Sequence, residues 1–356
     1  MQALGRHSRG SQGAAEELAE AGPAPDGEGD RLPGASRLLL ALLATAVAVA
    51  CGHAPPLPEP EAAPVLPPSA PPAVSCEVSR SPDCRPFGDC SAEEVIGAVC
   101  SRTVLEGESL IEMAREYDLG FGGIAAANPA LDPFVPTPGA TVVIPTAWIV
   151  PRAAAPGTLL VNLSEMRLYL MPATPGAPMT FPVGVGSEGW ATPLGTFKVI
   201  QKQTNPSWYP PASIRRENPE LPDVVPPGPD NPLGTHSLRL SKGSILIHGT
   251  DKPFGVGRKA SHGCLRLYPE DIPHLYERVA VGTRVSIVRE PVKVGQRGTR
   301  VYVEVHGDDE VRLDYLSEAK RLLARRGLLD RIDAQKLDSA VKELRGVPVD
   351  VSADGG

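Results

Sequence analysis

The sequence contains few aromatic residues, no long apolar segment and no excess of basic charge. Aromatic residues make up 4% of the 356 residues, so a core must be built mainly from aliphatic side chains. No apolar run reaches the roughly 18 residues that a membrane-spanning helix needs. The formal net charge is −7, and a mildly acidic chain without a basic block is a poor candidate for binding nucleic acid. These features exclude a multi-span membrane protein, and we expect no nucleic-acid partner.

Proline and glycine are abundant instead. The chain has 40 Pro and 36 Gly, which argues against a mainly helical protein and excludes a coiled coil. The apolar content of 42% is enough to build a core, so the chain as a whole is not disordered. Its length fits two or three modest domains.

The longest apolar run, Leu38 to Ala50, follows Arg37 and ends at Cys51. A run of this length is typical of the core of a signal peptide. Small residues directly before a cysteine resemble a bacterial lipoprotein signal, which implies that Cys51 is lipidated. We therefore predict that residues 1–50 are an N-terminal extension with an export signal, and that the protein lies in the cell envelope or periplasm, lipid-anchored to the outer membrane. An ordinary cleaved signal or a short uncleaved anchor is the alternative.

The next two segments are also typical of an exported protein. Residues 51–75 are rich in proline and are predicted to form an extended tether. Residues 76–100 are rich in cysteine, and four clustered cysteines in an exported chain most simply form two disulfides, whose pairing stays open. A zinc site is the rival, but the C-x2-C spacing of a zinc knuckle is absent. The clustered cysteines are Cys76, Cys84, Cys90 and Cys100.

Residues 101–148 have the pattern of a small βααβ unit. Residues 103–110 read TVLEGESL, with Ser109 as a predicted helix N-cap. An I-x-x-x-N-P segment at 124–129 and a P-G-x-x-x-x-I-P segment at 138–145 follow in order. This order resembles the LysM module, and the resemblance implies binding to glycans that contain N-acetylglucosamine, such as peptidoglycan. A packing domain without a ligand is the alternative.

The chemistry of the chain centres on one remaining cysteine. A buried-strand signal at 245–247 leads into His248, and residues 261–266 read SHGCLR, which places Cys264 beside His262. A free thiol is mostly protonated at neutral pH, and a neighbouring imidazole can take its proton and later return it to a leaving amine. A zinc site is less favoured, because only three ligands are present without a suitably spaced carboxylate. A buried structural cysteine with surface histidines is the other alternative.

This arrangement resembles the L,D-transpeptidase family, whose YkuD-type catalytic domain has a His-Gly strand end, a loop of about a dozen residues, and then [S/T]-H-G-C-hydrophobic-R. The likeness extends over residues 156–290. It implies that Cys264 is the nucleophile and that His248 accepts and donates the proton, with His262 as the rival base. It also implies that Ser261, Gly263 and Gly249 shape the site and its oxyanion hole, and that no metal or organic cofactor is needed.

The resemblance further implies acyl transfer in peptidoglycan. The cysteine would cleave the diaminopimelate–D-Ala bond of a tetrapeptide stem, and an amine of another stem or of a cell-wall-linked lipoprotein would resolve the thioester. The implied partners are peptidoglycan stem peptides and glycan, together with the membrane through the lipid anchor. One alternative is an L,D-carboxypeptidase or a hydrolase that trims cross-links with the same cysteine. An alternative of another class is a non-catalytic peptidoglycan-binding lipoprotein.

Three further side chains are candidates for substrate binding. Arg266 alternates with Cys264 along a predicted strand and could pair with a substrate carboxylate. Trp208 and Tyr209 lie in a Pro-rich insertion, residues 203–234, which is either a lid over the cleft or a surface excursion.

The fold class follows from the order of these segments. We predict a multidomain, mainly β protein with an L,D-transpeptidase-like β-sandwich catalytic domain at residues 156–290. Its many short strands include ones expected at 159–162 and 237–240, and its clearest helix is expected at 269–279. A small βααβ LysM module precedes this domain. A short helical tail at residues 298–356 follows it, with a short strand expected at 301–305 and amphipathic helices at 317–329 and 334–344.

Overall fold

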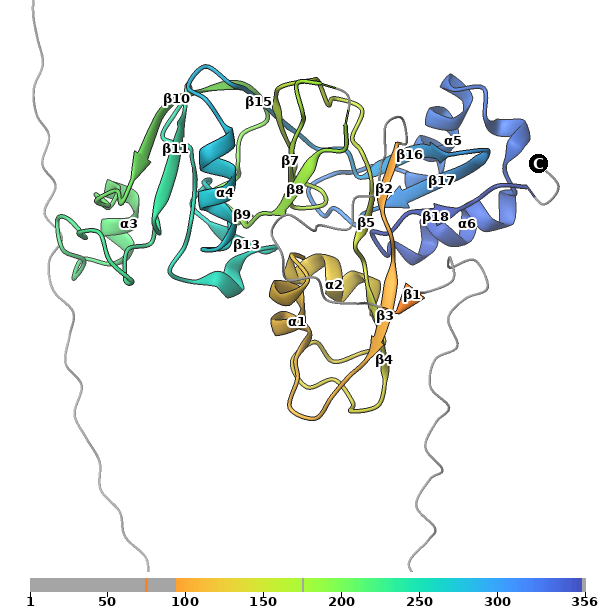
Figure 1. Cartoon of the computed structure of the whole chain (residues 1–356), viewed down its shortest axis with the longest axis horizontal. Helices are drawn as coiled ribbons and strands as arrows, with labels where there is room; N and C mark the ends of the chain where they lie inside the picture. The colour runs from red at the N-terminus through yellow and green to blue at the C-terminus, as the bar shows by residue number, and fades with distance from the viewer. Residues whose placement is uncertain (1–73, 76–93, 175, 354–356) are drawn as a thin grey trace, which may run out of the picture. The chain divides into compact units, whose positions relative to one another are not determined.

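The computed structural model describes residues 74–75, 94–174 and 176–353, all within one compact unit of the chain, residues 60–356 (Figure 1). The predicted export segment, Cys51, residues 51–73 of the proline-rich tether and Cys76, Cys84 and Cys90 lie outside the described residues, and those predictions stay predictions. No described helix is long and apolar enough to cross a membrane.

A strand, two helices and a second strand form the first described module, which we call the βααβ module (residues 100–144). Its elements are β3 (Cys100–Thr103), α1 (Leu110–Glu116), α2 (Phe121–Ala127) and β4 (Thr141–Ile144). Helix α1 begins at the predicted N-cap, because Ser109 accepts a hydrogen bond from the amide of Glu112. The buried side chains of Leu110, Met113 and Ala114 then pack into the core of the module. Strand β3 pairs with β4 and with β1 (Val74–Ser75).

The catalytic segment forms an eight-stranded mixed sheet in the order β14-β12-β11-β10-β15-β6-β7-β8. Its strands are β6 (Leu159–Asn162), β7 (Arg167–Leu170), β8 (Met179–Pro182), β10 (Gly195–Thr204), β11 (His236–Leu240), β12 (Leu246–His248), β14 (Leu265–Arg266) and β15 (Arg284–Val288). Two short strands, β9 (Val185–Gly186) and β13 (Lys259–Ser261), pair beside it. Short helical elements complete this segment: α3 (Ala212–Glu217), η1 (Pro253–Gly255) and α4 (Asp271–Arg278).

Strand β10 joins the two halves of this sheet. Residues 195–198 pair with β15, residues 199–204 pair with β11, and the register shifts between Val199 and Gln201. An irregularity of this kind bends a strand and increases its twist, so the sheet curls around an aliphatic core. Ile272 and Leu275 of α4 fill that core. The prediction of a mainly β catalytic domain is confirmed.

The C-terminal segment differs from the predicted helical tail. It contains a three-stranded antiparallel sheet of β16 (Val292–Arg297), β17 (Arg300–Val305) and β18 (Val349–Asp350), and this sheet begins before the predicted boundary at 298. The predicted helices are present as α5 (Tyr315–Arg325) and α6 (Ala334–Glu343), with η2 (Leu329–Arg331) between them. The helices could not bury their leucines alone. They pack against the valines of the sheet. Strand β17 covers the predicted strand at 301–305, whereas β16 and β18 were not predicted.

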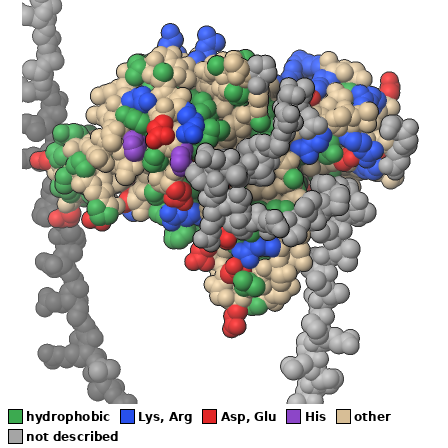
Figure 2. Space-filling view, in the orientation of Figure 1, with side chains coloured by type: hydrophobic (Ala, Val, Ile, Leu, Met, Phe, Trp, Pro, Cys, Tyr) green, Lys and Arg blue, Asp and Glu red, His purple; other side chains and the backbone are tan. Residues whose placement is uncertain are grey.

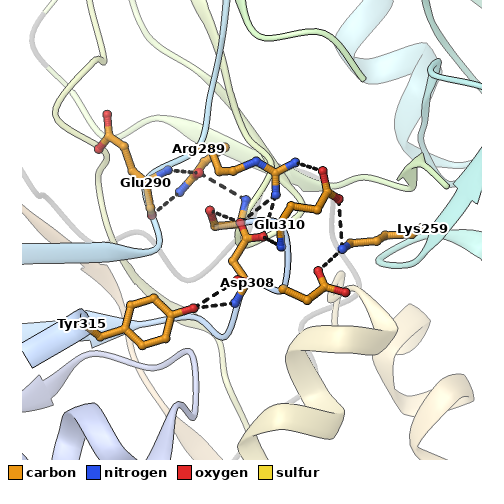
Figure 3. A network of polar contacts seen from close by, with 9 residues as sticks. Lys259, Arg289, Glu290, Asp308, Glu310 and Tyr315 are labelled. Carbon is orange, nitrogen blue, oxygen red and sulfur yellow. Dashed lines mark hydrogen bonds and ion pairs between the residues drawn. The ribbon is translucent and has the colours of Figure 1, made fainter. Parts of the chain in front are cut away.

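Charged side chains join this C-terminal module to the catalytic domain (Figure 3). Arg289 donates hydrogen bonds to Asp308 and Glu310, each at 2.7 Å. Lys259 of β13 lies 3.0 Å from Glu310 and also contacts Asp309. A further pair of strands, β2 (Val95–Gly97) with β5 (Ala147–Ile149), brackets the βααβ module. The described modules therefore share a continuous set of contacts.

Candidate active site

Two parallel strands bring the predicted catalytic residues together. Strands β12 and β14 pair with Ile247 opposite Leu265 and His248 opposite Arg266. Ile247 and Leu265 are fully buried in the core of the sheet. Because neighbouring residues of a strand point to opposite faces, His248, Cys264 and Arg266 share the other face.

The thiol of Cys264 is held by backbone groups. Its Sγ accepts a hydrogen bond from the amide of Leu246 at 3.4 Å and lies 3.7 Å from the carbonyl oxygen of Ser244. The side chain is partly buried and forms no disulfide. Burial raises the pKa of this thiol, against the Leu246 amide and the charges of Arg266 and Arg239, which lower it. At neutral pH the group is therefore a thiol, and it needs a base during the reaction.

Side-chain hydroxyls fix the turn that carries Cys264. Ser261 Oγ donates to the carbonyl of Cys264 at 2.6 Å and accepts from the amide of Gly263 at 3.1 Å. Thr192 Oγ1 donates to the carbonyl of Gly263 at 3.1 Å and accepts from the amide of Gly186 at 2.9 Å. Gly263 has a φ of +94°, a backbone conformation that favours glycine. The turn is thus rigid, but the Gly263 amide is engaged by Ser261 rather than turned toward a substrate.

His248 is buried and uncharged. Its Nδ1 lies 2.6 Å from the carbonyl oxygen of Gly249, which holds the tautomer with the proton on Nδ1. Burial and, to a lesser extent, the charge of Arg266 lower the pKa of His248, whereas the carbonyls of Gly249 and Pro232 oppose both effects, and the resulting pKa is about 4. The carbonyl of Gly249 thus contacts His248, whereas the amide of Gly249 donates to the backbone carbonyl of His236 at 3.2 Å. A neutral imidazole with a lone pair on Nε2 can accept a proton.

His262 lies in a different environment. Its Nε2 is 3.0 Å from Oε2 of Glu217, at the end of α3, and its ring centroid is 4.9 Å from that of Trp190. The side chain is about one third exposed. Among the described residues, no hydrogen bond joins Cys264 Sγ to either imidazole. Figure 2 shows histidine side chains among acidic and basic ones on one face of the catalytic domain.

Two guanidinium groups influence the thiol. Arg266 is partly buried, and its Nε has no hydrogen-bond partner among the described residues. Burial lowers the pKa of Arg266, and Asp251 opposes this effect. Arg239 of β11 pairs with Leu246, the residue whose amide contacts Sγ. A buried, unpaired Nε is an available donor for a carboxylate or carbonyl group.

The insertion between β10 and β11 is anchored at its base. Asn231 is buried, and its side-chain amide donates to the carbonyls of Pro206, Val225 and Pro226. Trp208 exchanges two backbone hydrogen bonds with Val225, and Tyr209 is 67% exposed. No contact among the described residues joins either ring to Cys264. The insertion reaches the active-site motif through Glu217 instead.

Sequence reasoning missed four residues of this site: Thr192, Trp190, Glu217 and Arg239. No local signal marks the first three, because they lie far from Cys264 in the sequence. Arg239 could have been found, since it alternates with the apolar residues Leu238 and Leu240 on a predicted strand.

The residues of a possible metal site lie elsewhere. Within the described part of the chain, donor atoms of Glu165, Glu304 and His306 lie within 4.8 Å of one another. The ammonium group of Lys293 already lies 2.7 Å from Glu165 and 2.8 Å from Glu304. The cation at this cluster is therefore a lysine, and Cys264 and His248 take no part in it.

Comparison with known proteins identifies the family of the chain. A family model for the L,D-transpeptidase catalytic domain, YkuD, matches residues 156–287. An Escherichia coli protein named "Probable L,D-transpeptidase YcfS" is 36% identical over 261 residues, which cover 69% of this chain and 81% of that protein. The E. coli protein named "Probable L,D-transpeptidase YbiS" is 38% identical over 264 residues, covering 69% and 85%. The chain belongs to the L,D-transpeptidase family and is an enzyme of that family.

Solved L,D-transpeptidases are more distant. The enzyme from Mycobacterium smegmatis is 18% identical with a TM-score of 0.31, over 41% of this chain and 64% of that one. L,D-transpeptidase 3 from Mycobacterium tuberculosis is 14% identical with a TM-score of 0.31, over 56% of this chain and 93% of that one. The family assignment rests on the relatives that match in sequence.

Proposed function

We propose that this enzyme is a peptidoglycan L,D-transpeptidase with Cys264 as its nucleophile. The observation that supports this best is the shared face of β12 and β14, where Cys264 lies with His248 and Arg266. Sγ attacks the carbonyl between diaminopimelate and D-Ala of a tetrapeptide stem, D-Ala leaves, and a thioester forms. The amine of a second stem, or of a cell-wall-linked protein, then attacks the thioester and releases Sγ.

The protonation states of the resting site define the proton path. Cys264 is a thiol and His248 is neutral, so the proton leaves Sγ only as the thiol attacks. Nε2 of His248 takes this proton and returns it to the amine of the departing D-Ala. The Nδ1 hydrogen bond to Gly249 stabilises the imidazolium that forms in between. His262 is the alternative base, with Glu217 as its charge partner.

Donors around Cys264 fit the charges of the substrate. The Cys264 amide is our candidate for the oxyanion hole, because Ser261 occupies the Gly263 amide. Arg266 binds a carboxylate of the donor stem through its guanidinium group. The roles of Trp208 and Tyr209 in binding the stem stay predictions.

The remaining segments complete the proposal. The βααβ module has the element order expected of LysM, and we propose that it binds peptidoglycan glycan. Cys100 is disulfide-bonded, in line with an exported chain. We further propose export to the cell envelope and lipidation at Cys51.

Analysis of reaction products tests this function. Purified enzyme is incubated with tetrapeptide muropeptides, and the products are identified by mass spectrometry. A dimer cross-linked between two position-3 residues supports transfer, whereas tripeptide alone supports the hydrolase. Cys264→Ala removes the nucleophile, so we expect turnover to fall by at least about 10³-fold while glycan binding stays intact. Equal activity in this variant would overturn the mechanism.

A covalent probe separates the enzyme from a non-catalytic wall-binding protein. The catalytic domain of an Enterococcus faecium L,D-transpeptidase is described as acylated by ertapenem. We expect the same carbapenem to label Cys264 in this chain. A folded sample that stays unlabelled would favour the non-catalytic protein.

A further inference from the structure

Backbone groups between α1 and the first turn of α2 form hydrogen bonds with the catalytic domain. Arg167 donates to the carbonyl of Asp118 at 3.1 Å, and the hydroxyl of Tyr268 donates to the carbonyl of Leu119 at 3.0 Å. The amides of Phe121 and Gly122 donate in the other direction, to a loop of the catalytic domain. Backbone groups at a buried contact need such partners, and here each module supplies partners to the other.

That loop caps helix α2. The N-cap residue, Gly120, has no side chain that could accept a hydrogen bond. The first two amides of the helix, of Phe121 and Gly122, donate instead to the carbonyls of Val256 at 3.3 Å and Gly257 at 3.0 Å. The first amides of a helix have no partner within the helix and must be satisfied from outside. The βααβ module thus takes the N-terminal cap of α2 from the catalytic domain.

The two backbones are in direct contact. A Cβ atom on Gly257 would lie 2.3 Å from the Cα of Gly120, and a Cβ on Gly120 would lie 2.7 Å from the Cα of Gly257. Gly257 also has a φ of +74°. Both positions therefore need glycine for this approach. The guanidinium of Arg258 covers the ring of Phe121, 4.7 Å from its centroid.

The same loop leads directly to the catalytic cysteine. The Gly257 amide donates to Val183 at 3.2 Å, the Val185 amide to Arg258 at 3.0 Å and the Ser187 amide to Ser261 at 2.8 Å. Residues 257–261 therefore lie between the N-terminus of α2 and the segment around β9. Ser261 ends this run and holds the Cys264 carbonyl through its hydroxyl.

We propose that the N-terminus of α2 is a structural part of the acyl-transfer site, with Gly120 and Gly122 as positioning residues. They fix loop 256–258 and, through β13, the turn from Ser261 to Cys264. The βααβ module then affects the chemistry of a stem peptide that carries no sugar. A module that only binds glycan would instead affect only glycan-containing substrates. This inference rests on the proposed function of Cys264.

Alanine substitutions in α2 test the proposal in the full chain. A Cβ on Gly122 would lie 3.0 Å from the carbonyl oxygen of Gly257, and a Cβ on Gly120 would press harder on the same residue. Gly123 is the matched control, because it lies in the same helix and a Cβ there meets nothing within 4 Å. The substrate is a soluble tetrapeptide stem without sugar, assayed well below the melting temperature of each variant.

We expect Gly122→Ala to lower kcat about tenfold with little change in KM, and Gly120→Ala to lower it further. Gly123→Ala should keep the wild-type kcat. Equal kcat values in all four proteins would overturn the proposal, as would a loss confined to glycan-containing substrates.

Hydrogen exchange gives a readout that does not depend on activity. We expect the amides of residues 256–261 to exchange faster in Gly120→Ala and Gly122→Ala than in Gly123→Ala. Unchanged exchange would overturn the positioning role even if activity fell. If wild-type protein fails to turn over any stem peptide while the exchange difference appears, the proposed function fails and the contact between the modules stands.

Discussion

Two clusters of ionisable side chains in this chain differ in the partners that their members have. In the cluster around Lys293, every charged group has a charged or hydroxyl partner. Lys293 contacts Glu165 and Glu304, Tyr169 donates to Glu165 at 2.8 Å, and His306 lies 2.6 Å from Glu304. At the active site, Cys264 contacts only backbone groups and Arg266 Nε has no partner among the described residues.

The pKa directions follow this difference. Burial lowers the pKa of Lys293, but the two glutamates outweigh it and the pKa is raised. Burial raises the pKa of Glu304, but Lys293 and His306 outweigh it and the pKa is lowered. At the active site burial prevails, raising the pKa of Cys264 and lowering that of His248. Lys293 and Glu304 therefore keep their charges, whereas Cys264 and His248 are neutral at neutral pH.

Replacing Lys293, the central residue of the first cluster, should have the largest effect of the four changes, and the effect is on stability. Lys293→Met leaves two buried carboxylates facing each other, so we expect the free energy of unfolding to fall by about 3–5 kcal/mol. Urea denaturation measures this loss. Lys320→Met, at an exposed position of α5, is the control and should stay within about 0.5 kcal/mol of wild type. A loss under about 1 kcal/mol for Lys293→Met would contradict the view that Lys293 keeps the charges of this buried cluster balanced.

The second prediction concerns pH. The folded protein holds the pKa of His248 at about 4 instead of 6.5, so below pH 6.5 the unfolded chain binds this proton first. Stability therefore falls as the pH drops from 6.5 through 4, by about 3 kcal/mol from this group. Urea denaturation at several pH values should show a shallower loss in His248→Gln. An identical pH dependence in both proteins would show that His248 is not held neutral by burial.

The third prediction tests the unpaired guanidinium. Arg266→Gln removes the donor proposed for the substrate carboxylate, so we expect the KM for a tetrapeptide stem to rise about 10- to 100-fold. Steady-state kinetics measure this change. Arg278→Gln, at an exposed position in α4, is the control and should leave KM unchanged. A KM that stays the same in Arg266→Gln would assign the carboxylate to another residue, with Arg239 as the next candidate.

The smallest effect is expected for a change in the insertion between β10 and β11, and it concerns kcat/KM. Glu217 and His262 form a partly exposed pair, and such pairs contribute less than about 1 kcal/mol. If His248 is the base, Glu217→Gln should lower kcat/KM by less than about fivefold. A larger loss, with a change in the pH profile of kcat/KM, would identify His262 as the base.

Much of the catalytic domain could be predicted from local patterns. The strand at 159–162 has the predicted bounds, and the strand before His248 and the helix at α4 lie where expected. Strand alternation also placed Arg266 on the face of Cys264. Of the C-terminal sheet, only the strand at 301–305 was predicted. Strand β16 is recognisable only with its partner β17, and the predicted leucine-rich helices gave no sign of the surface that they cover.

The sequence by itself determined the chemistry that we propose for this protein, because the SHGC turn and the His-Gly strand end are short, contiguous motifs whose residue types predict a thiol–imidazole site. Only the tertiary structure decided the protonation states and the supports of that site. Burial of His248 and Cys264, the contact of Glu217 with His262, and the cap that loop 256–258 provides to α2 all join residues far apart in the chain. Solvent exclusion and hydrogen bonds between distant segments arise only when the whole chain packs, and no local pattern encodes them.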